Sequence, residues 1–171
     1  IAIILSTKIM YLLYNYLLNT KKKLSSNFIV NYSNILEFVP SNTLKINESN
    51  FDIQNILYKT LLDFVTYNKI SKAIVSLSGG VDSMVLISIL KHINIEIIAI
   101  HINYNNRSET TLEQEFIEKW CELNNIQLYI KNITSIKRTS TKRADYENET
   151  RIIRYNFYKE ILKKEKLDSI I

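Results

Sequence analysis

Apolar residues form two kinds of run from about residue 51 onward. Short, almost continuous runs of Ile, Val, Leu and Ala are typical of strands that are buried on both faces of a sheet. Longer segments repeat their apolar residues at helical spacing. The predicted strands cover residues 72–77, 95–103, 126–133 and 167–171. The predicted helices cover residues 51–67, 82–93, 109–124 and 145–164.

Strands that alternate with helices predict a parallel sheet, because parallel neighbours need a crossover connection and a helix supplies it. Right-handed crossovers then place helices over both faces of such a sheet. We therefore expect an α/β domain over residues 51–171.

The first fifty residues have a different pattern. Residues 1–18 are strongly apolar, but polar residues interrupt the run, which favours a packed or amphipathic helix over the alternative of a membrane-associated one. Residues 24–50 are polar and contain the only proline, Pro40, as expected of a linker. We expect an N-terminal helical extension of unknown role over residues 1–50 and no stable membrane association.

The composition says more about where the protein is located than about its function. The net charge of +5 is compatible with nucleic-acid binding and equally with a lysine-rich solvated surface. A single cysteine, Cys121, excludes an intrachain disulfide and fits a reducing compartment. Abundant Ile, Asn, Lys and Tyr are typical of an AT-rich coding genome. The expected location is the cytoplasm, or the stroma or matrix of an organelle with such a genome.

The only two glycines, Gly79 and Gly80, stand together where the first strand gives way to a helix. Two glycines let the backbone approach a ligand closely, and Ser78 and Ser83 add hydroxyls to the free N–H groups of the helix start. This combination predicts an anion site, and the alternative is a tight turn without a ligand. Asp82 would repel a bound phosphate unless a magnesium ion lay between them. The spacing fits neither GxxxxGK[ST] nor GxGxxG.

The stretch SGGVDS resembles the signature of the PP-loop ATP pyrophosphatase superfamily. The resemblance implies a Rossmann-like sheet of the adenine nucleotide alpha hydrolase-like type. It also implies an enzyme that cleaves ATP between its α and β phosphates and adenylates a substrate. Asp82 would hold Mg²⁺ and act in catalysis. The residues implied to bind ATP in this stretch are Ser78, Gly79, Gly80, Val81, Asp82 and Ser83.

Residues 99–109 resemble a segment of the tRNA(Ile)-lysidine synthases that is usually written His-Val-Asn-His-Gly-Leu-Arg. His101, Asn103 and Arg107 match it, whereas Tyr104 and Asn105 depart from it. The match and its place at a strand end imply that His101 contacts the nucleotide, and the alternative is a core histidine.

Residues 147–155 match Glu-x3-Arg-x2-Arg-Tyr of the same family. On a helix, Glu147, Arg151, Arg154 and Tyr158 fall in one stripe. The resemblance makes Arg151 and Arg154 candidate catalytic residues that face nucleotide or RNA. The alternative is a solvated face with an i,i+4 Glu–Arg pair. The basic loop 137–143 either contacts RNA phosphates or is solvated.

The resemblance as a whole implies a lysidine synthase-like ligase. Such an enzyme uses ATP and Mg²⁺ to adenylate the wobble cytidine of tRNA(Ile) with a CAU anticodon, and free lysine then displaces AMP. A PP-loop tRNA thiolase and a non-catalytic nucleotide- or RNA-binding remnant remain the alternatives. The family's pattern continues into a Gly-His-x3-Asp-Asp segment that residues 1–171 do not contain, so we expect the domain to be incomplete at its C terminus.

Overall fold

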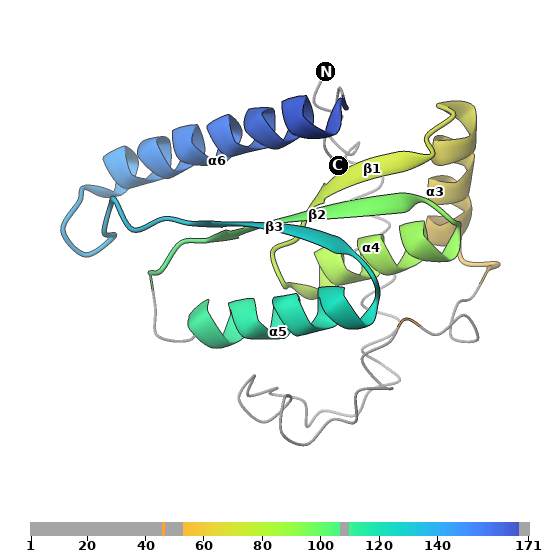
Figure 1. The fold of residues 1–171 in the computed structure, drawn as a ribbon, viewed down its shortest axis with the longest axis horizontal. Helices are drawn as coiled ribbons and strands as arrows, with labels where there is room; N and C mark the ends of the chain where they lie inside the picture. Colours follow the sequence, from red (N-terminus) through yellow and green to blue (C-terminus); the bar gives the residue numbers. More distant parts are fainter. Residues whose placement is uncertain (1–45, 47–52, 107–109, 168–171) are drawn as a thin grey trace.

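The computed structural model describes residue 46, residues 53–106 and residues 110–167 (Figure 1). The predicted extension over 1–50 (except Ile46), Arg107, and residues 168–171 of the strand predicted over 167–171 therefore lie outside the described residues. The elements in chain order are α3 (Ile56–Tyr67), β1 (Lys72–Ser76), α4 (Val81–His92), β2 (Glu96–Asn103), α5 (Thr110–Leu123), β3 (Gln127–Asn132) and α6 (Arg143–Glu165). Among these helices, none is both long and apolar enough to cross a lipid bilayer.

The predicted α/β fold is confirmed, and the largest difference from a predicted boundary is at the start of α3. That helix begins at Ile56 instead of residue 51, because Asn55 caps it. The Asn55 backbone is extended, and its side-chain oxygen accepts a hydrogen bond from the Leu57 N–H at 2.9 Å. An N-cap of this kind satisfies a donor that has no partner within the helix, so the helix starts there.

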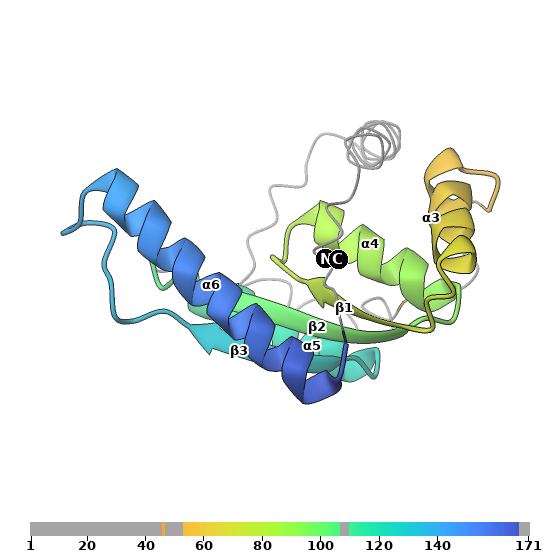
Figure 2. The ribbon, with the colours of Figure 1, turned by 90° about the horizontal axis from the view of Figure 1, so that it is seen from above.

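The three strands form a parallel sheet in the order β1-β2-β3. In the register, Val75 is paired with Ala99, and Ile100 with Tyr129. Helices α3, α4 and α5 cover one face of the sheet, while α6 lies diagonally across the other face (Figures 1 and 2). All three strands therefore end at the same edge, which is where open parallel sheets bind ligands.

Successive side chains of a strand point to opposite faces of the sheet, so the strands contribute to two separate cores, one on each face. On one face, Val75 and Ala99 pack with α3, α4 and α5 around Leu61, Leu90 and Ile117. On the opposite face, buried isoleucines of β1 and β2 pack against α6. The members of that second core are Ile74, Ile98, Ile100, Ile102, Ile133, Ile136, Tyr146, Phe157 and Ile161.

The amino ends of the strands are joined to the end of α6 by polar contacts. The Lys72 ammonium contacts Glu96 at 2.9 Å and Glu165 at 3.4 Å. The Glu165 carboxylate also accepts hydrogen bonds from Tyr129 Oη at 2.6 Å and Gln127 Nε2 at 3.2 Å. We call these five residues the amino-end network. It ties α6 to β1 and β3, so the helix cannot slide along the sheet without breaking these contacts.

Left-handed backbone conformations occur where helices and strands end, and asparagine or lysine adopts most of them. Positive φ angles are found at Lys69, Asn94, Asn105, Asn125 and Lys166, between 46° and 62°. Asparagine tolerates this region better than most residues. The chain therefore does not need glycine for ordinary helix ends, which makes the glycine at position 79 informative.

Candidate functional site

The turn between β1 and α4 requires glycine at position 79 for two reasons. Gly79 has φ +81°, outside the range of the other positive-φ residues. A Cβ atom at this position would also lie 3.0 Å from Cδ1 of Ile117 on α5. Gly80 follows with an extended backbone as the N-cap of α4, and a Cβ there would lie 3.3 Å from Ser78 Oγ. The turn is thus pressed against α5.

Hydroxyl groups hold this turn together. Ser78 Oγ accepts a hydrogen bond from the Gly80 N–H at 3.2 Å and lies 3.1 Å from Ser83 Oγ, which donates to the Gly80 carbonyl at 2.9 Å. Among the residues that the structure describes, no side chain forms a capping hydrogen bond at the start of α4. The start of a helix carries unsatisfied N–H groups and a partial positive charge, so this turn can bind an anion.

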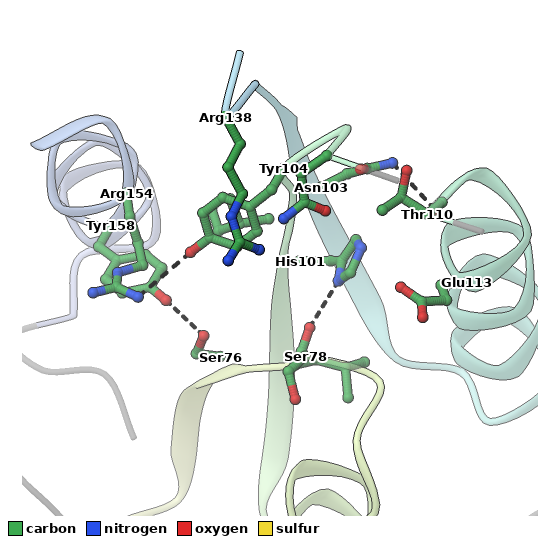
Figure 3. A pocket seen from close by; sticks show the side chains of 13 residues that line it. Ser76, Ser78, His101, Asn103, Tyr104, Thr110, Glu113, Arg138, Arg154 and Tyr158 are labelled. Carbon is green, nitrogen blue, oxygen red and sulfur yellow. Dashed lines mark hydrogen bonds between the residues drawn. The ribbon is translucent and has the colours of Figure 1, made fainter. Parts of the chain in front are cut away.

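A cavity of about 360 Å³ opens beside the turn, at the carboxyl ends of β1 and β2 (Figure 3). Its walls come from the two strands, the start of α5, the loop before α6, and α6 itself. The lining residues are Ser76, Leu77, Ser78, His101, Ile102, Asn103, Tyr104, Asn106, Thr110, Glu113, Arg138, Arg154 and Tyr158. We call it the strand-end cavity.

His101 connects the end of β2 to the loop that follows β1. The ring is buried, and its Nδ1 lies 2.9 Å from the carbonyl oxygen of Leu77. A carbonyl can only accept, so Nδ1 carries a proton and donates in this hydrogen bond. His101 therefore fixes the residue that precedes Ser78, and it also lines the strand-end cavity.

Asn103 fixes the other side of the same edge. Its amide nitrogen donates to Gln114 Oε1 at 2.9 Å and to the Thr110 carbonyl at 3.3 Å, while its amide oxygen accepts from the Asn105 N–H at 2.9 Å. These contacts hold the end of β2 against the first turns of α5.

Helix α6 closes the cavity with a tyrosine and an arginine. Tyr158 Oη and Ser76 Oγ lie 2.6 Å apart, and Arg154 Nη1 donates to Tyr104 Oη at 3.4 Å (Figure 3). Burial raises the pKa of Tyr158 above its ordinary value, against the opposing effect of the hydrogen bond with Ser76. The phenol therefore stays neutral at physiological pH.

A second hollow of about 390 Å³ adjoins the strand-end cavity along α6. Both Arg151 and Arg154 line it, and their guanidinium carbons lie 5.6 Å and 5.5 Å from the centre of the Tyr155 ring. Such distances are within the range of cation–π attraction. Glu147 also lines this hollow, but its carboxylate pairs with Arg143 at 2.7 Å and not with Arg151. The i,i+4 pair that the sequence suggested thus forms one turn earlier.

The structure brings some of the predicted site residues together and leaves others apart. Ser78, His101 and Arg154 line the strand-end cavity, and Arg151 opens onto the adjoining hollow instead. The rest of the turn adjoins the cavity without lining it: Gly79, Gly80, Val81, Asp82 and Ser83.

Several residues of the cavity were not singled out from the sequence. Ser76, Thr110 and Glu113 were not predicted as site residues, although a serine at the end of an apolar strand is a usable signal. The sequence places Arg138 only in a basic loop.

Asp82 lies exposed in the first turn of α4. Within the described part of the chain, no group of three or more His, Cys, Asp or Glu side chains is placed to hold a metal ion. A magnesium ion at a nucleotide needs only one or two protein carboxylates, because phosphate oxygens and water complete its ligands. Asp82 fits that kind of site and does not fit a metal centre built from protein alone.

Residues 52–171 match the family model for the PP-loop domain, which covers the whole sheet and the turn at residues 78–83. The chain belongs to the PP-loop family. The turn at 78–83 is accordingly called the PP-loop from here on.

Curated relatives of this PP-loop chain include two bacterial tRNA(Ile)-lysidine synthases. The protein from Mycoplasmopsis pulmonis is 33% identical over 98 residues, which cover 57% of this chain and 32% of the relative. The protein from Clostridium perfringens is 32% identical over 121 residues, which cover 66% of this chain and 26% of the relative. The chain therefore spans between a quarter and a third of the length of these relatives.

A solved structure shares the PP-loop fold. The NH3-dependent NAD synthetase from Campylobacter jejuni superposes with a TM-score of 0.52 and 20% sequence identity, covering 70% of this chain and 56% of that protein. At this identity the likeness supports the Rossmann-like fold alone.

Proposed function

We propose that the protein is a tRNA(Ile)-lysidine synthase-like ligase. The relatives at 32–33% identity carry that name, and their similarity covers more than half of this chain. The observation that carries the proposal is the strand-end cavity. It places a serine of the PP-loop and an arginine of α6 within one hollow at the edge where parallel sheets bind ligands.

In this proposal the PP-loop binds ATP. The bare start of α4 and the hydroxyls of Ser78 and Ser83 provide donors for phosphate oxygens. Asp82 holds a magnesium ion, which neutralises charge on the phosphates when it is bound. His101 contacts the nucleotide from the cavity wall.

Arg154 stabilises the negative charge that develops on the α-phosphate, since a guanidinium can hold two phosphate oxygens with parallel hydrogen bonds. Arg151 contacts the substrate from the adjoining hollow. The chemistry then has two steps. The C2 carbonyl oxygen of the wobble cytidine attacks the α-phosphate and pyrophosphate leaves. The lysine side-chain amine next attacks C2, loses a proton, and AMP leaves.

The tRNA supplies its target base from an anticodon loop, where bases are unstacked at low cost. Free lysine and tRNA(Ile) with a CAU anticodon are the proposed substrates. The proposed location is the cytoplasm, or the stroma or matrix of an organelle with an AT-rich genome.

The state of Cys121 disfavours a thiolase that would use it as a reactive thiol. Cys121 is buried in the core formed with α5, and burial raises the pKa of its thiol to about 12. A thiol in this state is almost wholly protonated at neutral pH and is a poor nucleophile.

The test is an assay of AMP and pyrophosphate release by the full-length protein with ATP, Mg²⁺, lysine and a tRNA(Ile) transcript. The matched control is the same transcript with uridine in place of the wobble cytidine. AMP release that needs lysine and cytidine together is the expected result, because pyrophosphate leaves before lysine reacts. AMP release without lysine, or pyrophosphate release at the same rate with the uridine transcript, would contradict the proposal.

A further inference from the structure

We infer that Arg138, in the loop between β3 and α6, is a phosphate-binding residue of the strand-end cavity. The inference rests on the proposed function and adds a residue that no motif identified. The shared ligand chemistry is a phosphoryl group, which belongs either to the nucleotide or to the RNA backbone.

The loop that carries Arg138 is held in place by the core. Ile133 and Ile136 are 2% and 8% exposed and pack in the core under α6. The Ile133 N–H also donates to the Asn103 carbonyl at 2.8 Å, and Asn105 Nδ2 donates to the Ile133 carbonyl at 3.3 Å. The burial and hydrogen bonds of these preceding residues fix the position of the Arg138 backbone, and so the point from which its side chain extends.

The Arg138 side chain runs from this loop toward Tyr104, inside the strand-end cavity (Figure 3). Arg154 reaches the same cavity from α6, so two guanidinium groups line one space of about 360 Å³. Glu113 lines the opposite wall, on α5. Neither arginine forms an ion pair with a carboxylate among the described residues.

The lack of a carboxylate partner among the described residues distinguishes Arg138 from Arg143, which begins α6. Arg143 is highly exposed and still pairs with Glu147 at 2.7 Å. Arg154 has the Tyr104 hydroxyl and the Tyr155 ring, both of which are uncharged. Two like charges that share a cavity repel each other, and an anion bound between them removes that repulsion.

A phosphoryl group fits this arrangement better than a single carboxylate. The cavity adjoins the PP-loop, whose helix start is an anion site in its own right. A guanidinium offers planar paired donors that match two phosphate oxygens, and two arginines from different elements can grip one tetrahedral group from two sides. Arg138 and Arg154 of α6 thus bind the same phosphoryl group from two sides.

The experiment compares Arg138→Gln and Arg138→Lys with Lys137→Gln in the full-length protein. Lys137→Gln removes the same charge from the neighbouring position, and Lys137 does not line the cavity. The dissociation constant for Mg–ATP is measured by calorimetry, that for tRNA(Ile) by filter binding at several salt concentrations, and the KM for lysine from initial rates of AMP release. Thermal unfolding of each variant confirms that it is folded.

Arg138→Gln is expected to weaken one of the two ligands roughly ten- to a hundredfold, the usual size for a lost charge-assisted hydrogen bond. Arg138→Lys should recover only part of the loss, and Lys137→Gln should cost less than about twofold. Weaker ATP binding assigns the phosphate to the nucleotide. Weaker tRNA binding with a reduced salt slope assigns it to the RNA.

Three results would overturn the inference. The first is equal effects of Arg138→Gln and Lys137→Gln, which would make the loop a general basic surface. The second is a defect confined to the KM for lysine, which would assign Arg138 to a carboxylate. If the unsubstituted protein binds neither ATP nor tRNA, the proposed function fails and the inference fails with it, whereas the first two results leave the proposed function standing.

Discussion

At the amino ends of the strands, the Lys72 ammonium contacts the carboxylates of Glu96 and Glu165 and so links β1, β2 and α6. At the carboxyl ends, Arg138 and Arg154 line a cavity, and neither pairs with a carboxylate of the described residues. The same helix, α6, takes part in both arrangements. Charges that are paired within the chain stabilise the fold, whereas the two arginines without a paired carboxylate are the ones that we propose to bind phosphate.

The largest expected effect is at the PP-loop, where Asp82→Asn should lower ATP turnover by roughly 10² to 10³-fold, as expected for loss of a group that stabilises transition-state charge. The fold should survive, because Asp82 is exposed. Asp63→Asn, which changes an exposed aspartate on α3, is the matched control. Initial rates of pyrophosphate release over a range of Mg²⁺ concentrations measure the effect, and an unchanged rate would remove Asp82 from the site.

The second prediction compares two arginines of α6. Arg154→Lys should lower kcat/KM about tenfold or more, since lysine keeps the charge but loses the planar fork. Arg143→Lys should be almost silent, because an exposed i,i+4 ion pair contributes very little and lysine keeps the charge. Measuring kcat/KM separately for ATP, lysine and tRNA shows which ligand the arginine serves. Equal, small effects at both positions would place Arg154 on a solvated face.

The third prediction separates the two reasons for glycine at position 79. Gly79→Ala should destabilise the protein by about 1–3 kcal/mol, because it combines a positive φ with a Cβ atom 3.0 Å from Ile117. Gly79→Asn tolerates the positive φ but still carries a Cβ atom. Denaturant unfolding should therefore show a loss for both variants that is smaller for asparagine, because only the Cβ contact remains there. No loss for asparagine would mean that φ alone, and not the closeness of α5, favours glycine.

The order of strands and helices could be predicted because burial leaves a recognisable pattern in each element: an almost continuous apolar run in β2 and apolar residues at helical spacing in α5. A backbone role for Gly79 was also predictable, since the chain uses glycine nowhere else but position 80. The closeness of Ile117 to position 79 was not predictable, because it depends on how α5 packs beside the PP-loop.

The lining of the strand-end cavity also depends on packing between elements and could not be predicted in full. Helical spacing placed Arg151 and Arg154 in one stripe, yet only Arg154 reaches the strand-end cavity, because the stripe faces two adjoining hollows. Arg138 belongs to a loop, whose side-chain directions follow from the burial of Ile136 and not from any period.

The smallest expected effect is at the amino-end network, where Glu165→Gln should weaken the fold slightly and leave the ATP kinetics unchanged. The hydrogen bond from Tyr129, followed by the contact with Lys72, lowers the pKa of Glu165 below its ordinary value. A carboxyl group whose pKa is lower in the folded state stabilises the fold above its unfolded-state pKa, and this stabilisation is lost as the pH falls through the folded-state value. The difference in unfolding free energy between the parent protein and Glu165→Gln should therefore be present at pH 7 and shrink on acidification below pH of about 4. Urea unfolding of both proteins at pH 7 and below pH of about 4 measures this difference in unfolding free energy. A loss of ATP turnover without a change in stability would contradict the division between the two ends of the sheet, because it would give a residue of the amino-end network a role at the site.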